Sequence, residues 1–226
     1  MKICVVVAQH GDELFGLKVL GGLVRANQNN ILNIVGNPEA IAKRKRFIDT
    51  DLNRSFNSDM RSREVELAKI IRTEIEKFNP DFLLDIHTSK TDIGKVAIVA
   101  EYSETIEQMA QLMSMETIVV MPKNIASESL IGCFPDKSIS VELGIGLRSD
   151  ELADKLVKNI LDLNIEKLIL KKNLPRYIVT KHIPKGIKEL NGIVNLKLNK
   201  ELNGYPFLAS PTSYDSIGGF LAEKAN

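Results

Sequence analysis

The sequence predicts an α/β fold in which helices cover both faces of a largely parallel or mixed sheet, with a small β-rich part at the C-terminal end. In the first part of the chain, short apolar, β-branched runs alternate with stretches that carry apolar residues at helical spacing. Beyond about Lys171, short strand-like pieces are separated by Gly, Pro and Asn. We therefore expect two domains, an α/β domain over residues 1–170 and a small β-rich domain over residues 171–226.

Each expected element has a local reason. Ile3 to Ala8 is apolar throughout, as in a strand buried on both faces. Leu14 to Arg25 has helical spacing, and a polar loop from Gly36 to Asp59 precedes an amphipathic helix from about Arg61 to Phe78. Asn79-Pro80 ends that helix, because a proline disfavours helical backbone in the residue before it. Further strands are expected at 31–35, 81–87, 95–100, 117–121, 138–143, 176–180, 192–198 and 205–208, and further helices at 103–115 and 150–168.

Composition limits the class of protein. The chain has 226 residues, with 44% hydrophobic and 26% charged residues, as in soluble globular proteins. Its 30 Lys and Arg nearly balance its 29 Asp and Glu, so no overall field recruits nucleic acid or an anionic membrane. No apolar run approaches the roughly 18 residues of a membrane span, and the start resembles a strand rather than a signal peptide. Cys4 and Cys133 have no metal-type spacing, so a reducing, cytoplasmic setting is expected.

Potential metal ligands stand where two expected strands end. His10 and Glu13 are three residues apart in the turn after the first strand, and His87 ends the strand that begins at Asp81. Two histidines and one carboxylate, with a fourth position left to water, form a recognised catalytic zinc set. Asp85 shares a strand face with His87 and is suited to orient its imidazole. The alternative is that these histidines are ordinary hydrogen-bonded polar residues at strand ends.

The polar loop offers a second group of candidates. The run from Lys43 to Arg46 is either a solvated basic turn or a nucleic-acid patch, and the absence of interleaved aromatic residues speaks against nucleic acid. Asn53 and Arg54 follow in the same loop, and a planar guanidinium beside an amide is suited to holding a carboxylate. Glu142 ends another apolar strand, where it is either a general base for a zinc-activated water or a surface residue.

Taken together, these segments resemble the aspartoacylase/succinylglutamate desuccinylase family, a branch of the zinc carboxypeptidase fold. The matching motifs lie between residues 10 and 144 and keep the family order: His-Gly-Asp-Glu, Asn-Pro-Glu-Ala, Asp-Leu-Asn-Arg-Ser-Phe, Asp-Ile-His-Thr and Val-Glu-Leu-Gly. The resemblance implies that His10, Glu13 and His87 bind one zinc ion per chain. It assigns the general acid/base role to Glu142, and Arg46 would help to polarise the scissile carbonyl.

The resemblance also implies how a substrate is held. Asn53 and Arg54 would bind the carboxylate of the amino-acid part, and Tyr214 would reach back from the C-terminal part to the substrate. Members specific for acetylaspartate carry an Arg about ten residues before the catalytic Glu, where this chain has Gly132. We therefore expect weak discrimination in favour of a side-chain carboxylate.

The resemblance implies a zinc-dependent hydrolase that cleaves the amide bond of a small, anionic N-acyl amino acid. The alternatives are a zinc carboxypeptidase acting on peptides and a non-catalytic zinc-binding relative. Neither nucleic acid nor a membrane is expected as a partner. The sequence leaves open the acyl group, the amino acid and the number of subunits, with a homo-oligomer among the alternatives.

Overall fold

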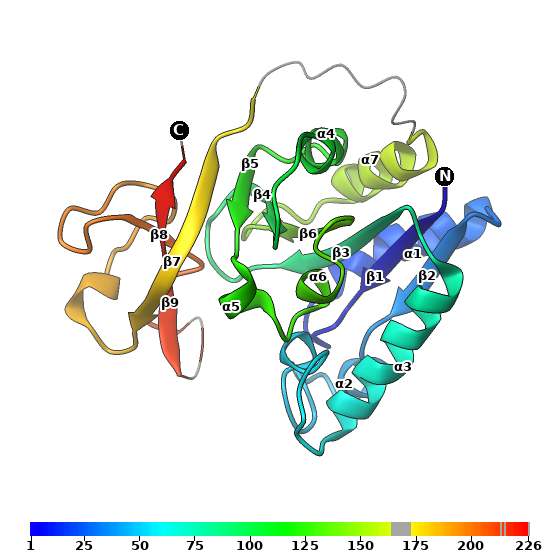
Figure 1. The fold of residues 1–226 in the computed structure, drawn as a ribbon, viewed down its shortest axis with the longest axis horizontal. Helices are drawn as coiled ribbons and strands as arrows, with labels where there is room; N and C mark the ends of the chain where they lie inside the picture. The colour runs from blue at the N-terminus through cyan, green and yellow to red at the C-terminus, as the bar shows by residue number, and fades with distance from the viewer. Residues whose placement is uncertain (164–172, 213, 215, 226) are drawn as a thin grey trace.

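The computed structural model describes residues 1–163, 173–212, 214 and 216–225. Within these residues, nine strands form one sheet in the order β2-β1-β3-β6-β4-β5-β7-β9-β8 (Figure 1). The strands are β1 Ile3–Val7, β2 Ile31–Val35, β3 Phe82–Thr88, β4 Lys95–Val99, β5 Thr117–Val120, β6 Ser138–Leu143, β7 Arg176–Pro184, β8 Tyr205–Phe207 and β9 Ile217–Lys224. β4 runs antiparallel to β6 and β9 antiparallel to both neighbours, whereas the other pairs are parallel. The predicted mixed sheet is confirmed.

Helices cover both faces of this sheet. The helices and 3-10 turns are α1 Phe15–Ala26, α2 Pro38–Ala42, η1 Leu52–Arg54, α3 Arg63–Phe78, α4 Glu104–Leu112, α5 Lys123–Ala126, α6 Leu130–Cys133, α7 Asp150–Leu161 and η3 Lys188–Leu190. α1, α4 and α7 pack in one apolar cluster, and α3 and α6 pack in another on the opposite face. Serine side chains cap the backbone at the starts of α3, α4 and α7, which satisfies donors that a helix start leaves free.

The structure corrects several predicted elements. The strand expected over 192–198 is wrong, because this segment forms turns in which Leu196 has φ of 58°. β9 was not predicted, since its Gly218-Gly219 pair is typical of a turn. The polar loop over 36–59 contains α2 and η1, and Asn37 caps α2 by accepting from the backbone of Ala40. The helix expected to reach residue 168 ends at Leu161, and residues 164–168 lie outside the described part.

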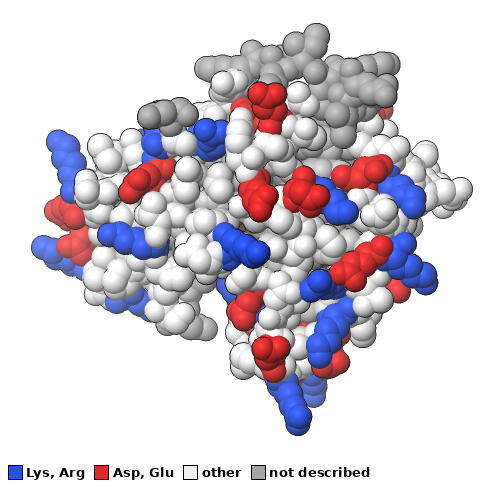
Figure 2. All heavy atoms as spheres, in the orientation of Figure 1, with Lys and Arg blue, Asp and Glu red and all other residues white. Residues whose placement is uncertain are grey.

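The C-terminal strands continue the same sheet. β7 pairs in parallel with β5, and one apolar cluster joins Ile98 and Val119 of the first part to Phe207 and Phe220 of the second. The division into two domains stays a prediction. On the face drawn in Figure 2, basic and acidic side chains are interspersed. No described helix has the length and apolar character needed to cross a bilayer.

Candidate metal centre and substrate pocket

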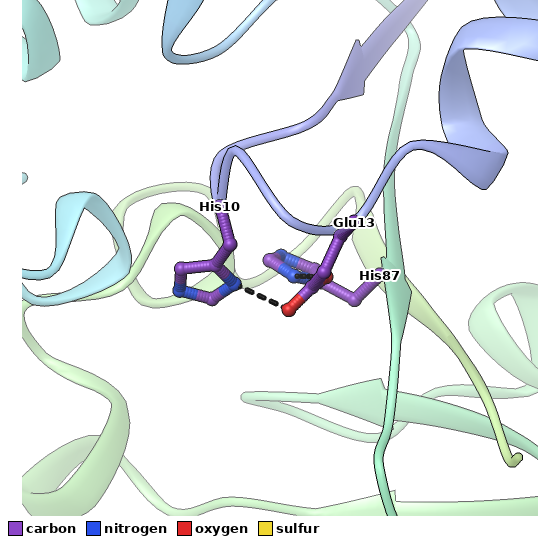
Figure 3. A group of neighbouring side chains, drawn as sticks. All are labelled: His10, Glu13 and His87. Carbon is purple, nitrogen blue, oxygen red and sulfur yellow. Dashed lines mark hydrogen bonds and ion pairs between the residues drawn. The ribbon is translucent and has the colours of Figure 1, made fainter. Parts of the chain in front are cut away.

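Three side chains that are distant in sequence meet at one edge of the sheet. β1 and β3 are parallel neighbours with Val7 opposite Ile86, so the turn after β1 lies beside the end of β3. His10 and Glu13 extend from that turn and His87 from β3, and the three point toward one another (Figure 3). Their ligand atoms all lie within 4.8 Å of one another, and all three residues are buried. The predicted ligand set is thus brought together by the fold.

The two imidazoles have matching orientations. His10 Nδ1 lies 2.6 Å from Glu13 Oε1, and His87 Nδ1 lies 3.0 Å from Glu13 Oε2. On the far side of each ring, Nε2 lies 2.9 Å from a carboxylate oxygen, of Asp51 for His10 and of Asp85 for His87. A carboxylate that accepts from Nε2–H leaves Nδ1 as the ligand atom, which is the usual support for a metal-binding histidine. Asp85 has its predicted position, whereas Asp51 was not predicted.

The charges of the cluster depend on one another. Burial lowers the pKa of His87, but the carboxylates of Asp85 and Glu13 outweigh it and hold the pKa well above its ordinary value. Burial raises the pKa of Glu13, but His10 and His87 outweigh it and hold the pKa well below its ordinary value. In the absence of a metal, the three groups therefore form a compact set of one ionised carboxylate and two imidazoles, and a metal ion bound there would displace the proton from each Nδ1. Borderline-soft Zn²⁺ prefers such a set, so the residues present fit this ion.

The loop between α2 and η1 completes the site. Arg46 Nη1 donates to Glu13 Oε1 at 3.1 Å, and Asp51 lies five residues further along the same loop. Buried Glu64 of α3 holds the segment between them, because its carboxylate accepts a side-chain hydrogen bond from Asn37 and backbone hydrogen bonds from residues 48–50, at 2.7 to 3.2 Å. Sequence reasoning missed Glu64, because a Glu near a helix start usually lies in solvent.

Glu142 lies opposite His87 in the register of β3 and β6, so it reaches the same edge of the sheet. Burial raises the pKa of Glu142 to about 7, against the opposing effect of His87. A carboxylate with a pKa near neutrality is suited both to accept a proton and to return it. The predicted base therefore stands within the pocket rather than on the surface.

Asn53, Arg54 and Tyr214 line the same pocket. Arg54 Nη1 donates to the carbonyl oxygen of Asn53 at 2.8 Å, and Asn53 Oδ1 accepts from the backbone of Leu130 at 3.1 Å. Burial raises the pKa of Tyr214, and the nearby Arg54 opposes this rise. The eight residues named from the sequence all line one cavity of about 110 Å³, and their roles stay predictions; they are His10, Glu13, Arg46, Asn53, Arg54, His87, Glu142 and Tyr214.

Comparisons with known proteins agree with this arrangement. The catalytic-domain model of the succinylglutamate desuccinylase/aspartoacylase family matches residues 1–163. A probable aspartoacylase of Prochlorococcus marinus strain MIT 9313 is 27% identical over 114 residues, which are 44% of this chain and 38% of that relative. A probable aspartoacylase of Trichodesmium erythraeum is 31% identical over 116 residues, which are 45% of this chain and 40% of that relative. The match therefore spans about two fifths of the length of these relatives.

Solved structures show the same fold. A succinylglutamate desuccinylase from Chromobacterium violaceum superposes with a TM-score of 0.78 at 17% identity, covering 100% of this chain and 85% of that chain. Murine aminoacylase 3 superposes with a TM-score of 0.70 at 16% identity, covering 100% of this chain and 95% of that chain. With the family model matching well over half of the sequence, the chain belongs to the succinylglutamate desuccinylase/aspartoacylase family.

Proposed function

We propose that this protein is a zinc-dependent hydrolase that cleaves the amide bond of a small N-acyl amino acid. The observation that carries the proposal is the convergence of three kinds of group on one small cavity. These are a zinc-type donor set, a buried carboxylate with a pKa near 7 and an Asn-Arg pair suited to a carboxylate. Hydrolysis of an amide beside a free carboxylate uses all three.

In this proposal His10, Glu13 and His87 hold the metal. Bound there, Zn²⁺ would act as a Lewis acid that makes water more acidic and polarises a carbonyl. Glu142 accepts the proton of the attacking water and returns it to the leaving nitrogen, so one buried carboxylate in the pocket serves both transfers. Arg46 donates to the oxygen on which negative charge develops as the carbonyl carbon is attacked.

The other residues hold the substrate and the imidazoles. Arg54 binds the carboxylate of the amino acid through its guanidinium, and Asn53 adds an amide donor beside it. Asp51 and Asp85 fix the two imidazole rings through their Nε2 atoms. Because these contacts are set before substrate arrives, the site needs little reorganisation during the reaction.

Two observations favour a small substrate over a peptide. The cavity is small, at about 110 Å³, and Leu208 and Tyr214 of the C-terminal part line it together with the groups from the sheet edge. A C-terminal segment at the pocket leaves little room for a peptide chain to continue past the scissile bond. A role in metal binding alone would not require a base, which makes Glu142 the argument against a non-catalytic relative.

The proposal is tested with zinc-loaded protein on acetyl and succinyl derivatives of Asp, Glu and Ala, with dipeptides and tripeptides in parallel. Release of the free amino acid from at least one N-acyl amino acid, faster than from any peptide, is the expected result. Glu142→Gln should slow it by about 10²–10⁴-fold, and Glu116→Gln, which changes an exposed carboxylate, should leave it unchanged. Faster cleavage of peptides would make the protein a carboxypeptidase, and no cleavage of either class would contradict the proposal.

A further inference from the structure

Two chemically different groups of residues line the cavity. One comprises the metal-ligand candidates, Arg46, Arg54 and Asn53. The other, which we call the apolar wall, consists of Ile98, Met121, Ala126, Ile131 and Leu208. All five also belong to the apolar cluster that joins β4 and β5 to the C-terminal strands. The apolar wall is therefore the edge of a packed core.

The position of the Asn-Arg pair decides which part of the substrate meets this wall. Asn53 Oδ1 accepts from the backbone N–H of Leu130 at 3.1 Å, so the pair lies directly against α6. Ile131, the next residue of α6, belongs to the apolar wall. The α-carbon of an amino acid is one bond from its carboxylate. With the carboxylate on Arg54, the side chain can then lie along the apolar wall while the acyl group lies toward Glu142 and the metal ligands.

The apolar wall offers no partner for a second carboxylate. Among the described residues that line the cavity, the cationic side chains are Arg46, Arg54 and Lys90. Arg46 is paired with Glu13 at 3.1 Å, and Arg54 is assigned to the α-carboxylate. Lys90 lies on the loop after β3; its side chain is 72% exposed and is paired with Asp12.

The hydroxyl groups near the wall do not replace a cation. The Ser129 hydroxyl donates to the carbonyl of Ala126 at 2.7 Å and accepts from the backbone of Gly132 at 3.2 Å, so it is already paired. Ser140 also lines the cavity, but a hydroxyl cannot neutralise a charge. A carboxylate that leaves water without a charge partner is strongly disfavoured, whereas an aliphatic group gains from the same burial.

We infer that the amino acid released by this protein carries an uncharged, aliphatic side chain of the leucine or methionine kind, and that the apolar wall selects it. This inference rests on the proposed function and adds the side-chain class to it.

The first test compares kcat/KM of zinc-loaded wild-type protein for the acetyl and succinyl derivatives of Leu, Met, Ala, Asp and Glu. Each buried methylene is worth about 10-fold or more in such a pocket, so we expect Leu or Met to exceed Asp and Glu by about 100-fold or more. Equal rates for Leu and Asp, or a preference for Asp, would overturn the inference and leave the proposed function intact.

A binding measurement separates the two claims. Zinc-loaded Glu142→Gln is titrated in a calorimeter with N-acetyl-leucine and N-acetyl-aspartate, and the leucine derivative should bind at least about 10-fold more tightly. If the wild type hydrolyses neither compound but the leucine preference persists, the proposed function fails, and only the selection of an aliphatic side chain in binding stands. Tighter binding of the aspartate derivative overturns the inference.

Variants of the wall test which residues select the side chain. Ile131→Val and Ile131→Ala remove one and three carbons, so kcat/KM for acetyl-Leu should fall in steps, by about 10-fold or more for Ala, with acetyl-Ala nearly unchanged. Ile106→Ala is the matched control, because Ile106 is buried in the cluster on the opposite face of the sheet. Ile106→Ala should change kcat/KM by the same factor for all substrates. If Ile131→Val and Ile131→Ala also change kcat/KM by the same factor for all substrates, Ile131 does not select the side chain.

Discussion

Replacing Glu64 by alanine tests whether one buried carboxylate holds the loop that carries Arg46 and Asp51. Glu64 is 1% exposed and lies in the first turn of α3. Its two oxygens accept backbone hydrogen bonds from residues 48–50 and a side-chain hydrogen bond from Asn37. Removing the carboxylate leaves three backbone donors and one amide donor without their acceptor.

The loss in stability follows from these contacts. A buried donor that loses its partner costs about 1–3 kcal/mol, and water entering the space left by Glu64 recovers part of this. We therefore expect Glu64→Ala to lower the free energy of unfolding by about 3–5 kcal/mol. Glu64→Gln keeps one acceptor oxygen and should lose less. Because the loop positions Arg46, we also expect kcat/KM to fall by up to about 100-fold in the variant that still folds.

Urea unfolding of the two variants, with Glu66→Ala as control, measures the stability effect. Glu66 lies on the same helix, with its side chain 69% exposed and its carboxylate paired with Lys69 at 2.8 Å. An exposed pair contributes about 1 kcal/mol at most, so the control should stay close to the wild type. A Glu64→Ala protein as stable and as active as the Glu66→Ala control would refute the reasoning.

Three further predictions concern the site itself. Glu142→Gln should keep zinc and fold but lose about 10²–10⁴-fold in kcat, measured at saturating substrate. In the wild type, kcat should fall on the acidic side, because Glu142 must be ionised to accept a proton; without metal its pKa is about 7, and a nearby zinc ion lowers it, so the midpoint of this fall should lie below about pH 7. Arg54→Ala should weaken binding of N-acyl amino acids by about 2–5 kcal/mol without changing zinc content.

Each of these three predictions can be contradicted by a specific result. A loss in kcat below tenfold for Glu142→Gln would mean that another group is the base. A kcat that showed no fall on the acidic side, or a fall with its midpoint above pH 7, would mean that ionisation of Glu142 does not control the reaction. Equal turnover of a free-acid substrate and its methyl amide would show that Arg54 does not bind a carboxylate.

The parts of the site on regular strands could be predicted from the sequence. His10 and His87 end apolar runs that were recognisable as buried strands, and parallel neighbours bring such ends together. Asp51 and Glu64 could not be assigned in this way, because their partners lie 41 and up to 27 residues away and depend on how the loop folds. The only indication of Asp51 in the sequence was its place as the first residue of the Asp-Leu-Asn-Arg motif.

The C-terminal part was predicted less well for a related reason. β8 has only three residues, and the pairing of β7 with β9 contains register shifts. Gly218 and Gly219 lie in β9 because neighbouring atoms leave little room for a Cβ there, which no local propensity expresses. The composition of the apolar wall likewise depends on contacts between distant segments, so the side-chain preference emerges only from the folded structure.

In the proposed mechanism, hydrolysis depends on one zinc ion held by His10, Glu13 and His87. The most direct measurement is a zinc titration of chelator-treated protein, in which hydrolysis of an N-acyl amino acid is followed at each step. Activity should rise linearly and level off at one equivalent of zinc per chain, and His87→Ala should not recover it. Full activity in the chelated protein, or full recovery of His87→Ala at one equivalent of zinc, would contradict the account.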